Sequence, residues 1–182
     1  KVFQRADYIQ AISQYLAEWG RQMGATCPIE VVPNGVAPEK FQARSTKHEA
    51  SPKLKTVVTT SRLVYKNGVA TLIEAMRFLP ENVRLRIVGD GPELQNLERL
   101  GSTLGVDERI EFVGGILPTA IAGELGYADV FVRPSRSEGL GNSFLEAMAA
   151  GLPTVGTAVG GIPDFLKDGE TGWFCEVNNP QD

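Results

Sequence analysis

From residue 54 onward, short runs of apolar and β-branched residues alternate with stretches of helical pattern, and this alternation restricts the fold more than any other feature. Such short runs are typical of strands that helices cover on both faces. The expected strands are residues 55–60, 84–88, 110–113, 129–132, 153–156 and 173–177, and the expected helices are residues 69–79, 92–104, 143–150 and 162–167, with another beginning near Pro118. Strands separated by helices pair in parallel, so the sequence predicts an α/β fold with a doubly wound parallel sheet of about six strands.

The segment before this unit has a different pattern. A short strand leads to Ser13, a residue type that suits the N-cap of the amphipathic helix that follows, and a second short strand comes after the helix. Residues 42–53 are polar and contain no large apolar side chain, as in a linker. We therefore predict that residues 1–41 end a preceding domain, that residues 42–53 link it to the next, and that residues 54–182 form the sheet domain of a larger protein.

The composition excludes several classes of protein and of site. A hydrophobic fraction of 42% and a charged fraction of 22% are those of a globular chain, and the net charge of −4 argues against a dedicated binder of nucleic acid or anionic membranes. His48 is the only histidine, and Cys27 and Cys175 lie far apart, so we expect no metal site and no histidine-dependent catalysis. No uncharged apolar run reaches the ~18 residues of a transmembrane helix, and we expect a cytoplasmic protein.

In a parallel α/β sheet, ligands bind at the loops that follow the strands, and two early loops carry suitable residues. Arg62 and Lys66 precede a helix start, where a diphosphate would suit them, although such cations are also common in solvated loops. Gly89-Asp90-Gly91 follows the next strand but lacks the third glycine of the dinucleotide fingerprint. This loop is either a tight turn or one wall of a nucleotide pocket.

The loop after the strand at residues 129–132 is the most informative. It carries Glu138 and two glycines, Gly139 and Gly141, and it leads into an apolar helix that contains Glu146. The glycines leave backbone amides accessible at the helix start, where phosphate or sugar oxygens can bind. A carboxylate buried on an apolar helix needs partners, and ribose hydroxyls would supply them, whereas a salt bridge or an exposed helix face is the alternative.

Taken in order, these motifs resemble the C-terminal domain of family 4 retaining glycosyltransferases, which have the GT-B fold. The residues that carry the resemblance are Arg62 with Lys66, Gly89 to Pro92, the pair Glu138 and Glu146 with seven residues between them, Gly160-Gly161, and, for the end of the N-terminal domain, Ile9 to Ser13 and Val31 to Val36. The resemblance covers nearly the whole chain. It implies a Rossmann-like sheet that binds a nucleotide-sugar donor.

The resemblance also implies a role for each matching residue. Arg62 and Lys66 would bind the donor diphosphate and stabilise the leaving group, Glu138 would contact the transferred sugar, and Glu146 would hold the ribose hydroxyls. These first three residues form the expected catalytic set. The complete expected donor-binding set is Arg62, Lys66, Gly89, Asp90, Gly91, Val113, Gly114, Glu138, Gly139, Leu140, Gly141, Asn142, Ser143 and Glu146.

The activity implied by the resemblance is transfer of a hexose, with retention of configuration, to a saccharide or lipid acceptor. UDP or GDP is the expected nucleotide, no cofactor or metal is expected, and the acceptor would bind through an N-terminal domain that is absent here. We therefore expect the chain alone to bind nucleotide weakly and to be inactive, and contact with the inner face of a membrane stays open. Two positions depart from the resembled pattern: Leu140 stands where an aromatic residue is frequent, and Arg133 where an apolar residue is expected.

Two other hypotheses are compatible with the same motifs. The chain could be a non-catalytic nucleotide-binding module of this fold, in which the carboxylates are structural. It could also belong to another GT-B enzyme, such as a sugar phosphorylase, whereas a nucleotide-sugar epimerase is disfavoured because the single histidine lies in the linker. The base, the sugar, the acceptor and the oligomeric state are left open.

Overall fold

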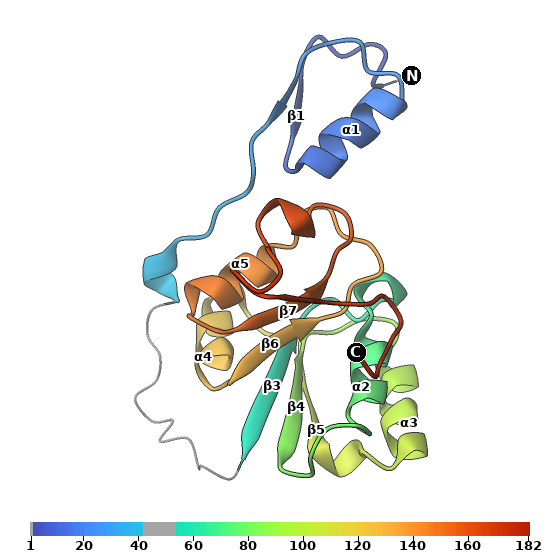
Figure 1. The fold of residues 1–182 in the computed structure, drawn as a ribbon, viewed down its shortest axis with the longest axis vertical. Helices are drawn as coiled ribbons and strands as arrows, with labels where there is room; N and C mark the ends of the chain where they lie inside the picture. The colour runs from blue at the N-terminus through green and yellow to red at the C-terminus, as the bar shows by residue number, and fades with distance from the viewer. Residues whose placement is uncertain (1, 42–53) are drawn as a thin grey trace.

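The computed structural model describes residues 2–41 and 54–182, and its main body is a six-stranded sheet (Figure 1). The strand order is β5-β4-β3-β6-β7-β8, and every neighbouring pair is parallel. The strands are β3 (Lys55–Thr60), β4 (Val83–Val88), β5 (Ile110–Gly114), β6 (Val130–Arg133), β7 (Thr154–Thr157) and β8 (Trp173–Cys175). The predicted doubly wound parallel sheet of about six strands is therefore confirmed.

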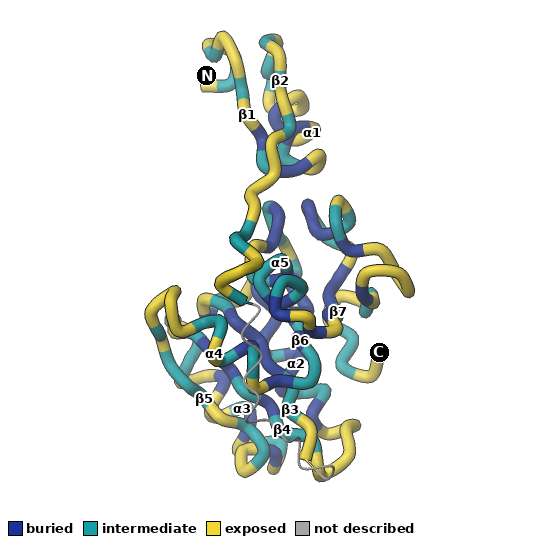
Figure 2. Tube along the Cα trace, turned by 90° about the vertical axis from the view of Figure 1, so that its left-hand side faces the viewer, coloured by how far each residue is buried: buried dark blue, intermediate teal, exposed yellow. Residues whose placement is uncertain are grey.

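Helices lie on both faces of this sheet, with α2 and α3 beside one face and α4 and α5 beside the other (Figure 1). Their bounds are α2 (Val69–Ala75), α3 (Leu94–Leu104), α4 (Ile121–Gly126) and α5 (Asn142–Ala149), and single 3₁₀ turns are η2 (Tyr65–Asn67), η3 (Asp107–Arg109), η4 (Pro118–Ala120) and η5 (Ile162–Asp164). Each face has its own apolar core, because successive side chains of a strand point to opposite faces. Ile87 packs with the α2 side, whereas its neighbour Val88 packs with the α4 and α5 side. Buried residues lie in β3, β4, β6 and β7, whereas the edge strands β5 and β8 are intermediate or exposed (Figure 2).

Two expected helices differ from the structure. The helix expected at residues 69–79 ends at Ala75, and the guanidinium of Arg109 donates to the carbonyl oxygens of Met76, Leu79 and Pro80, so these groups are satisfied without further helix. The helix expected at residues 162–167 is only the 3₁₀ turn η5. Pro163 is the second residue of this turn, and the chain then bends back so that Asp168 pairs with Gly172.

The N-terminal segment is a small parallel unit of its own. Strands β1 (Ile9–Ala11) and β2 (Ile29–Val31) pair in parallel around helix α1 (Gln14–Gln22), and the turn η1 (Pro38–Lys40) follows. The side chain of Ser13 accepts a hydrogen bond from the Leu16 backbone N–H, as expected of an N-cap. The expected linker at residues 42–53 lies outside the described residues, and the division of the chain into domains stays a prediction.

Candidate functional site

The candidate residues come from the two strands at which the sheet changes direction. From β3 the chain builds outward to β4 and β5, then returns to β6 and continues to β7 and β8. The loops after β3 and β6 therefore lead to helices on opposite faces, and in folds of this kind a ligand crevice is expected at this point of the carboxyl edge. Arg62 and Lys66 lie on the first of these loops, and Glu138 lies on the second.

The two loops are in direct contact. Gly68, at the end of the β3 loop, has φ +71°, and a Cβ at this position would overlap the Pro134 carbonyl oxygen. The backbone N–H of Arg136 donates to the Lys66 carbonyl oxygen at 2.7 Å. The Arg136 guanidinium also stacks on the Tyr65 ring, 4.3 Å from its centroid, and donates to the Tyr65 carbonyl oxygen. Glycine and arginine thus hold the Lys66 loop against the loop that carries Glu138.

An open pocket of about 680 Å³ lies over the cationic loop. Its lining residues are Arg62, Val64, Tyr65, Lys66, Asn67 and Arg133. Three of these six residues are cations, so the pocket favours an anion although the whole chain is acidic. The sequence indicated Arg62 and Lys66 at this place, and the structure adds Arg133.

Arg133 is the centre of a buried hydrogen-bond network. Its side chain donates to Ser143 Oγ at 2.6 Å, to Asn67 Oδ1 at 2.9 Å and to Glu138 Oε2 at 2.7 Å. The other carboxylate oxygen of Glu138 accepts the Gly139 backbone N–H at 2.9 Å. Burial lowers the pKa of Arg133, and the nearby carboxylates of Glu138 and Glu146 oppose that shift.

Glu146 lies on α5 and lines a second pocket. This pocket has a volume of about 490 Å³, and Lys40, Phe41 and Pro118 are among its other lining residues. Burial raises the pKa of Glu146, and the Arg133 charge opposes the shift. Phe144, fully buried under α5, packs edge-on against Phe131 of β6 at 5.2 Å between ring centroids, which fixes the helix that carries Glu146. The carboxylate is therefore partly desolvated at the wall of a pocket.

The loops after β4 and β5 meet the β3 loop beside these pockets. A Cβ at Gly89 would overlap the Ser61 carbonyl oxygen, and a Cβ at Gly91 would overlap that of Leu63. The Gly89 N–H donates to the Gly114 carbonyl oxygen at 2.9 Å, so the loops of Gly89 and Gly114 are also joined. The Gly89–Gly91 turn and the Val113–Gly114 strand end are thus brought to the same edge as Arg62.

The remaining candidates lie around the start of α5. Gly141 precedes the helix with φ +98°, Asn142 bonds Asn34 of the N-terminal segment at 3.2 Å, and Ser143 bonds Arg133. Leu140 is buried, with 3% of its surface exposed. Its side chain packs in the fold instead of facing a donor.

Two residues in this region were missed as site residues by the sequence reasoning. Asn67 is buried, and its amide nitrogen donates to the Arg62 carbonyl oxygen at 2.6 Å while its oxygen faces Arg133. Asp164 accepts the Gln14 backbone N–H at 2.7 Å and so joins α1 to the loop after β7. The unexpected arginine before Pro134 was a usable signal for the contact between Arg133 and Asn67. Nothing in the local sequence indicates the contact between Asp164 and Gln14.

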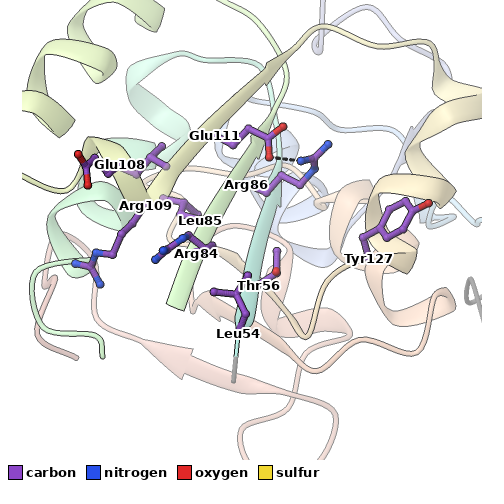
Figure 3. Close-up of a pocket in the computed structure, with 10 residues that line it drawn as sticks. Leu54, Thr56, Arg84, Leu85, Arg86, Glu108, Arg109, Glu111 and Tyr127 are labelled. Atoms are coloured by element: carbon purple, nitrogen blue, oxygen red, sulfur yellow. Dashed lines mark hydrogen bonds and ion pairs between the residues drawn. The ribbon is translucent and has the colours of Figure 1, made fainter. Parts of the chain in front are cut away.

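A further pocket of about 510 Å³ lies at the opposite edge, where β3, β4 and β5 begin (Figure 3). Four of its five charged groups are engaged within the protein: Arg86 pairs with Glu111 and with Glu124, and Arg84 and Arg109 donate to backbone carbonyl oxygens. This arrangement serves the fold, and the amino edge of a parallel sheet is not where ligands bind. The carboxyl edge remains the candidate site.

The fold is a doubly wound α/β sheet, a class that binds ligands at the carboxyl edge, where the candidate residues lie. Residues 40–182 match the family described as glycosyl transferases group 1, and the chain belongs to that family. The chain is 35% identical, over 92% of its length and 48% of the relative, to a GDP-mannose-dependent alpha-(1-6)-phosphatidylinositol monomannoside mannosyltransferase of Mycolicibacterium smegmatis. It is 34% identical, over 98% of its length and 52% of the relative, to the lipopolysaccharide core biosynthesis glycosyltransferase LpsE of Rhizobium meliloti. The chain thus spans about half the length of the curated relatives that it matches.

Solved structures agree on the fold. Anabaena Alr3699/HepE in complex with UDP and glucose matches 97% of this chain and 51% of its own, with a TM-score of 0.87 and 23% identity. Sucrose-phosphate synthase from Thermosynechococcus elongatus matches 98% of this chain and 47% of its own, with a TM-score of 0.89 and 25% identity. The fold is that of the C-terminal half of GT-B glycosyltransferases. Among residues 2–41 and 54–182, no helix is long and apolar enough to cross a membrane.

Proposed function

We propose that the chain is the nucleotide-sugar-binding part of a retaining hexosyltransferase that acts on a saccharide or lipid acceptor. The observation that carries the proposal is the junction of the Arg62–Lys66 loop with the Glu138 loop through Arg133 and Asn67. In this proposal the cations at the junction bind a diphosphate, and the carboxylate beside them binds a sugar. The relatives support it, since one is named as GDP-mannose-dependent and HepE was solved with UDP and glucose.

In this proposal each side chain has a distinct chemical role. Arg62 and Lys66 bind the diphosphate and stabilise the negative charge that grows on it as the sugar leaves. Glu138 accepts hydrogen bonds from hydroxyls of the transferred sugar, and Glu146 accepts them from the ribose, which replaces the water that burial removes. The two carboxylates thus bind and position the donor, and they are not an acid–base pair of a hydrolase.

The other donor contacts are proposed for backbone groups. Amides of Gly139, Leu140, Gly141, Asn142 and Ser143 reach sugar and phosphate oxygens at the start of α5. Gly89, Asp90 and Gly91, together with Val113 and Gly114, flank the base. The cations serve the leaving group without a metal, and no organic cofactor takes part.

Because the chain spans about half the length of its relatives, we place the acceptor site in the remainder of a longer protein. The chain alone then binds UDP or GDP weakly and transfers no sugar. We propose a cytoplasmic location, where nucleotide sugars would be the donors and a lipid acceptor would bring the protein to the inner face of a membrane.

One observation favours a second candidate function, a non-catalytic nucleotide-binding module. Glu138 is already paired with Arg133 at 2.7 Å, as a carboxylate with a purely structural role would be. A module of this kind would bind a nucleotide and its sugar conjugate equally well, because Glu138 would not touch the sugar.

Calorimetric titration of the chain with UDP, GDP and ADP tests the donor site, using the original chain and Glu146→Gln. We expect selective binding of UDP or GDP, and a loss of about tenfold or more in the variant, because a charged hydrogen-bond acceptor for the ribose is removed. Glu98→Gln, on the exposed face of α3, is the matched control and should bind as the original chain does. Unchanged affinity in Glu146→Gln together with lower thermal stability would assign this carboxylate to the fold.

A further inference from the structure

Arg133 is a charged side chain in a position that the fold does not require to be charged. It ends β6, and only 8% of its surface is exposed. Removal of a guanidinium from water is costly, and a buried ion pair is often no more stabilising than apolar residues of similar size. The pair of Arg133 with Glu138 is therefore weak as an explanation of stability, and its position in the crevice points to another role.

The donors of Arg133 are directed at three different segments. Nη2 donates to Asn67 at the end of η2 and to Glu138 on the β6 loop, and Nη1 donates to Ser143 at the start of α5. Nε is buried and has no acceptor among the described residues. Both N–H groups of Nη2 are thus engaged within the protein, which leaves the guanidinium poorly placed to bind a diphosphate itself.

The network continues to the loop that carries the cations. The amide oxygen of Asn67 accepts from Arg133, and its nitrogen donates to the Arg62 carbonyl oxygen at 2.6 Å. Glu138, at the other end, is held at both oxygens, by Arg133 on one and by the Gly139 N–H on the other. Each oxygen of the carboxylate keeps a further lone pair for a ligand hydroxyl.

We propose that Arg133 is a positioning residue that orients the Glu138 carboxylate toward the donor sugar and joins it, through Asn67, to the diphosphate-binding loop. This inference rests on the proposed function, because it needs a donor in the crevice. Its consequence is specific: loss of Arg133 weakens the contact with the sugar far more than the contact with the diphosphate, because Asn67 keeps its own hydrogen bond to the Arg62 carbonyl oxygen.

The quantity to measure is the ratio between the dissociation constants of a nucleotide and of its sugar conjugate. The probes are UDP with UDP-glucose and GDP with GDP-mannose, titrated calorimetrically up to millimolar concentration. The variants are Arg133→Met, Arg133→Lys, Glu138→Gln and the double variant Arg133→Met/Glu138→Gln. Arg109→Met is the matched control: its guanidinium is also held by hydrogen bonds within the protein, here to backbone carbonyl oxygens, but it lies at the far edge of the sheet.

We expect the original chain to bind the sugar conjugate about tenfold more tightly than the nucleotide, as a charged hydrogen bond allows. In Arg133→Met and in Glu138→Gln this ratio should fall to about one, and the double variant should lose nothing more, because both changes remove the same contact. Arg133→Lys should give an intermediate ratio, since one ammonium cannot serve three acceptors in a planar fork. Affinity for the nucleotide alone should change by less than about threefold in every variant.

Three results with the Arg133 variants would overturn the inference. One is an unchanged ratio in both Arg133 variants, and another is a parallel loss of nucleotide affinity, which would make Arg133 a diphosphate ligand. The third is unfolding of Arg133→Lys as well as Arg133→Met, which would make the residue structural. If the original chain binds a nucleotide with no preference for its sugar conjugate, Glu138 is no sugar ligand, the inference fails, and the result favours the non-catalytic module over the proposed transferase. Failure to bind any of the four probes rejects the proposed donor site itself.

Discussion

Glu146 and Glu138 show how two carboxylates of one loop-and-helix motif come to different environments. Glu138 accepts hydrogen bonds from Arg133 and from the Gly139 backbone N–H. Glu146 faces a pocket, and loss of water is the main effect that disfavours its charged form. Desolvation without a strong partner disfavours the charged form. A ligand that donates hydrogen bonds to Glu146 would replace the hydrogen bonds to water that the carboxylate loses on burial.

The raised pKa of Glu146 predicts how pH acts on binding and on stability. The ionised carboxylate accepts hydroxyl hydrogen bonds, so nucleotide affinity should fall as the pH is lowered through the raised pKa. Stability should change in the opposite direction. The folded state binds the proton more tightly than the unfolded state, so the contribution of Glu146 becomes less favourable as the pH rises from the ordinary glutamate pKa through the raised one.

Titrations with UDP or GDP at several acidic pH values would measure this effect. In Glu146→Gln the corresponding part of the pH dependence should be absent, both in affinity and in thermal stability. The same acidic loss of affinity in the original chain and in this variant would assign the pH dependence to another group.

At the scale of elements, the crevice depends on close contacts between loops that follow different strands. The β3 loop passes Pro134 of the β6 loop at Gly68, and it passes the β4 loop at Gly89 and Gly91. In each contact a backbone carbonyl oxygen occupies the space that a Cβ would need. Glycine is required at these positions because two loops of the chain approach closely, and at Gly68 also because the backbone is left-handed.

Gly68→Ala tests this contact, and the chain offers a matched control in Gly105→Ala. Both glycines have left-handed backbone, with φ +71° and +67°, but a Cβ at Gly105 meets nothing within 4 Å. The left-handed conformation alone should cost about 1–2 kcal/mol of unfolding free energy in each variant. Gly68→Ala should lose at least ~1 kcal/mol more and should also weaken diphosphate binding, because the overlap with Pro134 displaces the Lys66 loop.

Denaturant unfolding and nucleotide titration of both variants measure the two effects. Equal destabilisation of Gly68→Ala and Gly105→Ala, with unchanged nucleotide affinity, would show that the two loops separate without consequence for the site.

At the scale of the whole molecule, the N-terminal segment touches the sheet domain through the loops of the candidate site. Asp164, after β7, accepts the backbone N–H of Gln14 at the start of α1, and Asn34 bonds Asn142 at the start of α5. Gly139 and Gly161 lie against Leu16 and Ser13. The position of the N-terminal segment is therefore linked to the loop that carries Glu138.

Asp164→Ala should release this contact while leaving the sheet intact. Ser13 remains the N-cap, and the variant loses only a carboxylate at the helix N-terminus, worth about 0.3–1 kcal/mol of local stability, so amide hydrogen exchange in α1 should become faster. Asp164→Asn keeps an acceptor oxygen and should stay close to the original chain. Unchanged exchange in α1 of Asp164→Ala would mean that Asp164 does not hold the segment.

Much of the fold and of the candidate site followed from local pattern. The alternation of short β-branched runs with helical stretches was sufficient for a parallel doubly wound sheet, because each chain segment carries its own periodicity. Ser13 was identified as an N-cap because capping uses a side chain next to the helix it serves. Helix ends were less accurate: the α2 terminus depends on Arg109, a residue more than 30 positions away whose contribution has no local signature.

Only the tertiary structure decided which of the predicted site residues meet and what holds them. Asn67 and Arg133 are 66 residues apart in the chain, and their contact exists because β3 and β6 are neighbours in the sheet. The sequence determined the residue types at the carboxyl edge, the glycines and the cations, since these follow from motifs of a few residues. It did not determine that Leu140 is buried or that Arg133 holds Glu138, because burial and pairing depend on strand order, and strand order is set by the free energy of the whole packed sheet.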